Sequence, residues 1–148
     1  NANQALDRII NFFPDDRREQ LLMDLSLNLR AIMAQQLLPT PDGKGRRIAV
    51  EVLLNTPLVS DLIRKGETHK LKEVMSRSGE QGMQTFDQAL YDLYSQGEIS
   101  YDDAISHADS ANEVRLLIKL GSRAPGSSNE QYSSKMYDVD LDSITFGD

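Results

Sequence analysis

The stretch IAVEVLLNTPLVSDLIRKG, residues 48–66, contains both kinds of element from which we expect this protein to be built. Six of its first seven residues are apolar and three of these are β-branched, which is typical of a strand. Thr56 is then an N-cap residue, Pro57 occupies the first helical position, and Gly66 ends the segment. The stretch therefore predicts a strand that leads directly into a short helix.

Two helices and the other strand of a hairpin are expected before this stretch. The first helix has apolar residues at helical spacing and ends at Pro14. The second carries an apolar stripe from Leu21 to Gln36, about four turns of helix. Residues 37–47 then connect to the strand at 48–54 as a hairpin, and Pro39 either ends its first strand early or places it at an edge.

Four more short helices are expected after the stretch. One is predicted near residues 69–77. The next begins with a capping box formed by Thr85 and Gln88, and the last two begin at the N-cap residues Ser100 and Ser110. These elements predict a mainly α protein of the α+β class, whose short helices depend on tertiary packing.

Composition excludes several classes of protein. The 148 residues are 39% hydrophobic and 26% charged, as in ordinary globular chains. The net charge of −7 argues against wholesale nucleic-acid binding. The absence of cysteine excludes disulfides, thiol nucleophiles and cysteine-ligated zinc, and no apolar run of about 18 residues is present. The chain opens Asn1-Ala2-Asn3 without methionine, so we expect a cytoplasmic protein cut from a longer one.

Searches for catalytic motifs find little. Gly43-Lys44-Gly45 is better explained by a hairpin turn than by a phosphate loop. His69 and His107 are far apart in sequence, with no second imidazole at i+4. Glu51 interrupts the apolar strand at 48–54, and we expect it to pair with a basic neighbour or, as the alternation favours, to face solvent. The residues alone indicate a compact, mainly helical, non-catalytic piece.

Three stretches together indicate a family. They are residues 56–66, residues 82–90 with the pattern G-M-Q-T-x-D-Q, and residues 99–104. In this order they resemble the C-terminal region of type IV pilus retraction ATPases, the PilT/PilU family, and residues 3–14 resemble the segment after that family's histidine box. The resemblance covers residues 1–120.

The resemblance is to the PilU branch, the accessory partner of the main retraction motor PilT. The PilT motif A-I-R-N-L-I-R-E aligns with residues 58–65, and only Leu62, Ile63 and Arg64 match it. Pilus assembly ATPases typically carry a four-cysteine zinc module soon after the position of Gln36, where this chain has a short turn. The retraction class is therefore favoured over the assembly class.

The resemblance implies three regions. Residues 1–55 would be the last helices and β-hairpin of a RecA-like P-loop ATPase core, residues 56–120 a helical C-terminal subdomain, and residues 121–148 a flexible, disordered acidic tail. The phosphate loop, acidic boxes and histidine box, which serve ATP and Mg in the parent, would precede Asn1. We therefore expect no catalytic, cofactor-binding or metal-binding residue in this fragment, and no activity from it alone.

By the same resemblance, the parent is a hexameric motor that powers pilus retraction and twitching motility at the cytoplasmic face of the bacterial inner membrane. The fragment would contact neighbouring subunits of a homo-hexamer, the companion ATPase PilT and, indirectly, the pilus inner-membrane platform. A free-standing helical adaptor without motor activity is the alternative.

Candidate interaction residues come from three places in the sequence. Thr85 is already explained as an N-cap, and Arg64 also fits a helix-end cation that complements the helix dipole. The tail alternates acidic and apolar residues, so it is either a solvated tail or a docking peptide for the companion ATPase. The candidates are Leu62, Ile63 and Arg64 in the predicted helix, Gln84, Thr85 and Asp87 in the motif, and Leu141, Ile144 and Phe146 in the tail.

Overall fold

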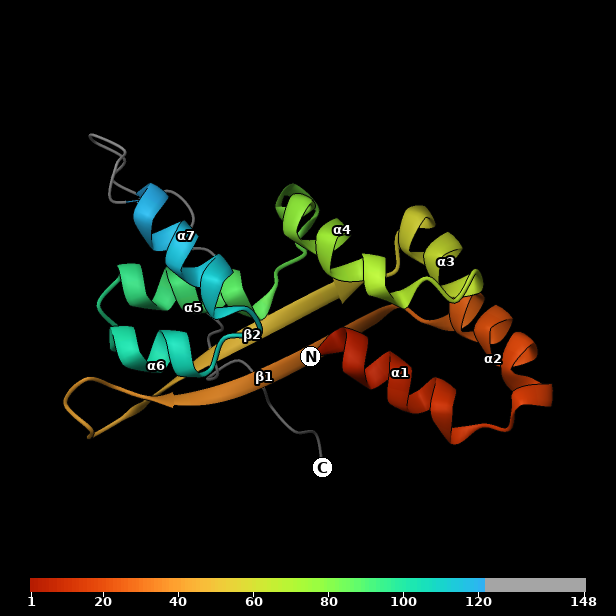
Figure 1. Ribbon diagram of the computed structural model, residues 1–148, viewed down its shortest axis with the longest axis horizontal. Coiled ribbons are helices and arrows are strands. Elements are labelled where there is room, and N and C mark those ends of the chain that lie inside the picture. The colour runs from red at the N-terminus through yellow and green to blue at the C-terminus, as the bar shows by residue number, and fades with distance from the viewer. Residues whose placement is uncertain (122–148) are drawn as a thin grey trace, which may run out of the picture.

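The computed structural model describes residues 1–121, which form seven α-helices and one β-hairpin (Figure 1). The predicted tail, with its candidates Leu141, Ile144 and Phe146, lies outside the described residues. The elements are α1 (Ala2–Phe12), α2 (Asp15–Asn28), β1 (Ala31–Pro39), β2 (Arg46–Leu54), α3 (Pro57–Arg64), α4 (Leu71–Arg77), α5 (Phe86–Ser95), α6 (Tyr101–Ser106) and α7 (Ala111–Gly121), with 3₁₀ turns at Thr68–Lys70 and Gly79–Gln81.

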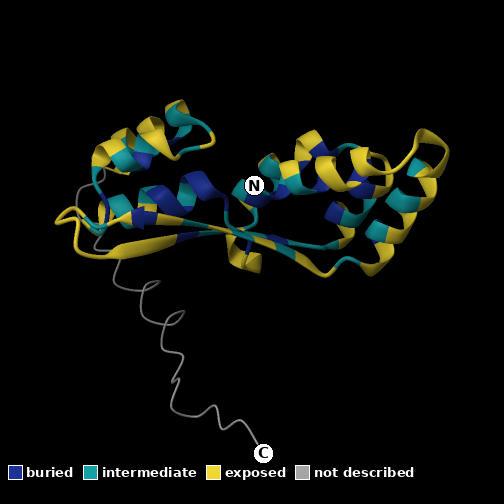
Figure 2. Ribbon diagram, turned by 90° about the horizontal axis from the view of Figure 1, so that it is seen from below, coloured by how far each residue is buried: buried dark blue, intermediate teal, exposed yellow. Residues whose placement is uncertain are grey.

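A long antiparallel hairpin runs through the molecule. Its register extends from Ala31 opposite Leu54 to Pro39 opposite Arg46. Helices α1, α2 and α3 gather at one end of the hairpin, and α5, α6 and α7 gather at the other (Figures 1 and 2). Side chains alternate along β2, so that Ala49, Glu51 and Leu53 are buried against the helices.

The prediction that the second helix continues to Gln36 is wrong. Helix α2 ends at Asn28, and residues 31–39 form β1 instead. The side chain of Asn55 donates hydrogen bonds to the carbonyls of Ser26 and Leu29, both at 2.9 Å, and Ser60 Oγ donates to the Ser26 carbonyl at 2.7 Å. These distant residues supply hydrogen-bond donors to carbonyl groups at the end of α2, so the helix can end there. The apolar residues that follow then pair with β2.

The helix starts predicted at Thr56, Thr85, Ser100 and Ser110 are confirmed, and each is capped by the side chain of that residue. Thr56 Oγ1 accepts a hydrogen bond from the backbone N–H of Val59, and Ser100 Oγ accepts one from Asp103. Thr85 and Gln88 form the predicted capping box. Pro39 was expected either to end the first strand of the hairpin early or to place that strand at an edge, and it is the last residue of β1.

The buried side chains form two hydrophobic clusters, one at each end of the hairpin. The first joins α1, α3 and α4 to Leu53 of β2. The second joins α5, α6 and α7 to Leu38 and Ala49. Both clusters combine residues from before and after position 55. The domain boundary expected at this position stays a prediction.

Candidate functional site

The middle of the hairpin carries a buried carboxylate between the two clusters. Glu51 is 1% exposed and accepts hydrogen bonds from the backbone N–H groups of Ala2, at 2.5 Å, and Phe86, at 3.3 Å. These are the first residues of α1 and α5, so one carboxylate binds the positive ends of two helices. The expectation that Glu51 faces solvent or a basic side chain is wrong, because two helix N-termini supply the donors.

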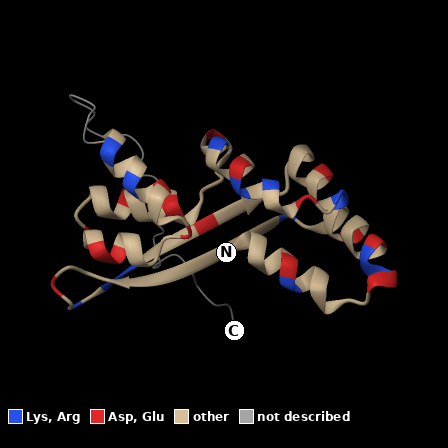
Figure 3. Ribbon diagram, in the orientation of Figure 1, with Lys and Arg blue, Asp and Glu red and all other residues tan. Residues whose placement is uncertain are grey.

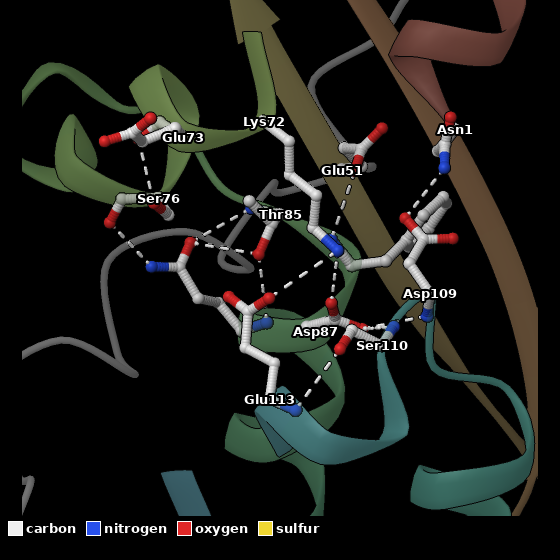
Figure 4. A network of polar contacts seen from close by, with 12 residues as sticks. Asn1, Glu51, Lys72, Glu73, Ser76, Thr85, Asp87, Asp109, Ser110 and Glu113 are labelled. Atoms are coloured by element: carbon white, nitrogen blue, oxygen red, sulfur yellow. Dashed lines mark hydrogen bonds and ion pairs between the residues drawn. The ribbon is translucent and has the colours of Figure 1, made fainter. Parts of the chain in front are cut away.

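Burial raises the pKa of Glu51 above its ordinary value. The hydrogen bonds from Ala2 and Phe86 act in the opposite direction, and the nearby charge of Asp109 adds to the increase. Asp109 is itself held by the side chain of Asn1, whose Nδ2 donates to it at 2.9 Å (Figure 4). The start of α1 is therefore tied to both β2 and the turn before α7.

A second buried carboxylate, Asp87, lies in the first turn of α5 and is fully buried. Its Oδ1 accepts hydrogen bonds from the backbone N–H groups of Asp109, at 2.9 Å, and Ser110, at 3.2 Å, just before α7. Its Oδ2 lies 2.6 Å from Nζ of Lys72 in α4, and Glu113 of α7 lies 3.7 Å from the same Nζ. Asp87 therefore joins α5 to α4 and α7.

The ammonium of Lys72 is stabilised by this arrangement. Burial alone would lower the pKa of Lys72, but the hydrogen bond and charge of Asp87, together with Glu113 and Asp109, outweigh it and raise this pKa. Lys72 therefore keeps its positive charge at neutral pH. We call Glu51, Lys72, Asp87 and Asp109 the carboxylate junction (Figure 4).

The sequence motif at residues 82–88 forms one side of this junction. Gly82 adopts φ +88°, a left-handed conformation that favours glycine. The backbone of Gln84 pairs with Val52 of β2 through two hydrogen bonds of 2.8 and 3.0 Å. Thr85 starts α5, and Gln88 Nε2 donates to the Ser76 carbonyl at 3.0 Å. The motif is accounted for as a connection between the hairpin, α4 and α5, and any contact of Gln84, Thr85 or Asp87 with a partner stays a prediction.

The predicted residues of α3 lie elsewhere. Leu62 and Ile63 are buried in the first cluster, where they pack α3 against the rest of the chain, and any contact of theirs with a partner stays a prediction. Arg64 is half exposed and pairs with Asp61 at 2.8 Å, and Asp61 also binds Lys65 at 2.6 Å. The structure therefore brings Asp87 together with Lys72 and Asp109, which the sequence did not single out, but not with Arg64.

The chemistry of the junction suits holding helices in place. Each buried carboxylate accepts two backbone N–H groups, and Asp87 is also neutralised by Lys72. Within residues 1–121, no group of three or more histidine and acidic side chains could hold a metal ion. No helix in that range is long and apolar enough to cross a membrane.

The Glu51 carboxyl makes stability depend on pH with a defined sign. A raised folded-state pKa means that the contribution of Glu51 to stability is full below its unfolded pKa and is lost as pH rises through the folded pKa. Wild type should therefore gain stability over Glu51→Gln between pH 7 and about pH 4.5, by about 1.4 kcal/mol per unit of pKa difference. Urea unfolding at both pH values measures this gain. Glu73→Gln, at an exposed position, is the control, and an equal wild-type advantage at both pH values would contradict the assignment.

Comparison with known proteins gives close relatives, although no protein-family model matches the chain. The chain is 74% identical over 124 residues, 84% of its length, to the type IV pilus ATPase PilU of Pseudomonas aeruginosa. It is 31% identical over 104 residues, 70% of its length, to the type IV pilus retraction ATPase PilT of the same organism. A crystal structure of the pilus retraction motor PilT with bound ADP matches 77% of this chain, with a TM-score of 0.68 and 32% identity, and the match covers 31% of that chain. The chain spans 32% of the length of PilU and 30% of that of PilT.

Proposed function

Because this chain belongs to the PilT/PilU family of type IV pilus ATPases, we propose that it is the C-terminal region of a hexameric, PilU-like pilus retraction motor that acts in twitching motility. The 74% identity to PilU over 124 residues carries this proposal. ATP and Mg would be bound by residues of the parent outside this chain. The parent would work at the cytoplasmic face of the inner membrane.

Residues 1–55 are proposed to belong to a larger RecA-like core. Among the described residues, the sheet has two strands, so the outer edge of β1 has no strand partner. A two-stranded sheet has little stability of its own, and Met33 of β1 is 71% exposed. The relatives are about three times as long as the matched region. Further strands and apolar side chains from the rest of the parent would cover this edge and Met33.

The helical region is proposed to supply subunit and partner contacts. Leu58 of α3 is 55% exposed and lines a shallow hollow with Val74 and Arg77 of α4. Arg64 lies on the same helix and is also accessible. Neighbouring subunits of a homo-hexamer and the companion ATPase PilT are the proposed partners, with the inner-membrane platform contacted indirectly. The carboxylate junction would hold α4, α5 and α7 in the arrangement that such contacts require.

A chimaera tests the proposal biochemically. The matching residues of P. aeruginosa PilU are replaced by this chain, and the purified protein is examined by light scattering and phosphate release. We expect a hexamer-sized particle that hydrolyses ATP, and no hydrolysis above the buffer blank from the 148-residue chain alone. A folded chimaera that stays monomeric and inactive would favour the free-standing adaptor instead.

Met33→Lys is expected to have different effects in the two proteins. In the chain alone, a charge at this exposed position should change the free energy of unfolding by less than about 0.5 kcal/mol. In the chimaera, the same charge would be buried against the rest of the core and should prevent folding or assembly. Gln4→Lys, at an exposed position of α1, is the control. Normal assembly of the Met33→Lys chimaera would show that this face is not covered.

A further inference from the structure

The end of the hairpin is held by its own hydrogen bonds. In the loop between β1 and β2, the backbone N–H of Thr40 donates to the Gly45 carbonyl at 3.0 Å, and that of Gly43 donates to the Thr40 carbonyl at 2.8 Å. Asp42 accepts from the hydroxyl of Thr40 and the N–H of Lys44 at 2.5 and 3.1 Å, and these bonds lower the pKa of its carboxyl. Neutral donors thus hold the Asp42 carboxylate within the loop and leave its negative charge in place.

Two cations at this end have no ion-pair partner within residues 1–121. Lys44 and Arg46 are exposed, whereas the neighbouring Arg47 pairs with Glu98. Figure 3 shows basic residues in blue at this end of the hairpin. Beside them lie Leu37 and Ile48, which face each other across the hairpin and are 52% and 48% exposed. The hairpin end therefore offers positive charge next to apolar surface in a protein of net charge −7.

We propose that this hairpin end binds the chain's own segment 137–146, YDVDLDSITF, independently of the proposed function. The segment is complementary to the surface in charge and also carries apolar side chains. Asp138, Asp140 and Asp142 would meet Lys44 and Arg46, and its large apolar residues would cover Leu37 and Ile48. An acidic protein offers this segment few other attractive surfaces, because most of its charge repels carboxylates.

The length of the chain permits this contact. Helix α7, which ends at Gly121, and the hairpin end lie at the same end of the molecule (Figures 1 and 2). A flexible linker with the length of segment 122–136 would span roughly 20 Å on average, and any linker of that length can span at most about 50 Å. Such a tether gives the segment an effective concentration in the millimolar range. A weak site, with a dissociation constant near 1 mM for the free segment, would therefore be substantially filled.

Carbodiimide cross-linking of the full chain tests the contact, because this reagent joins lysine amines to carboxylates in direct contact. We expect roughly tenfold more product between Lys44 and the tail aspartates than between the same aspartates and Lys70, an exposed lysine in the 3₁₀ turn before α4 that pairs with Glu67. About 0.5 M salt should reduce this product, since it screens exposed charges. Mixing ¹⁵N-labelled and unlabelled chains separates contacts within a chain from contacts between chains.

A charge exchange provides the matched control. Arg46→Asp should lower the Lys44 product to the Lys70 level, and adding Asp140→Arg should restore products of Lys44 with Asp138 and Asp142. Equal yields at Lys44 and Lys70 would overturn the proposal, as would products that join labelled to unlabelled chains, which would indicate a second copy. Failure of Asp140→Arg to restore the product would also count against it.

Discussion

Asp87→Ala is expected to lower the free energy of unfolding by about 3–5 kcal/mol, the usual cost of breaking a buried ion pair from one side. The substitution leaves the Lys72 ammonium without its partner at 2.6 Å. It also removes the acceptor of the Asp109 and Ser110 backbone N–H groups, so the start of α7 loses its attachment to α5. Urea denaturation at pH 7, followed by circular dichroism, measures the loss.

Asp61→Ala is the matched control for Asp87→Ala. Asp61 also binds two cations, Arg64 and Lys65, but both cations are exposed and Asp61 is only partly buried, so its loss should cost at most about 1 kcal/mol. Similar losses for the two variants would mean that burial and the backbone N–H groups add nothing at Asp87.

Leu90→Ala is expected to cost about 2–5 kcal/mol, because Leu90 is fully buried in the second cluster and alanine would leave a cavity there. Leu62→Ala in the first cluster should fall in the same range. Arg64→Ala should cost no more than about 1 kcal/mol in the same denaturation experiment, since its ion pair is exposed.

Arg64 should matter more for function than for stability. In the full-length parent, Arg64→Ala is expected to weaken activity while the fold persists. A loss of stability at Arg64 as large as that at Leu62 would instead make Arg64 a structural residue.

Local chemistry explains which parts of the fold could be predicted. Thr56, Thr85 and Ser100 each bond a backbone N–H three residues later, so their helix starts can be recognised from neighbouring residues. The identity of β1 depends on partners far along the chain. Its residues have the spacing of a helix as well as of a strand, and Asn55 and the nine-residue pairing with β2 determine the outcome.

The candidate site was predictable to the same limited extent. The motif at residues 82–88 singled out Asp87, but its partners Lys72 and Asp109 are 15 and 22 residues away. Alternation along β2 suggested the wrong face for Glu51, because the β-branched residues Ile48, Val50 and Val52 lie on the opposite face, whereas the structure buries the face that carries Glu51. The sequence could not show that the first N–H groups of α1 and α5 converge there to satisfy it.

Twitching of P. aeruginosa tests most directly whether this chain is a working part of a PilU-like retraction motor. The chimaera is expressed in a strain from which PilU has been deleted, with intact PilU and an empty vector as references, and colony expansion at the agar interface is measured. We predict expansion close to that with intact PilU. Expansion no greater than with the empty vector, at equal levels of folded protein, would contradict the proposed function.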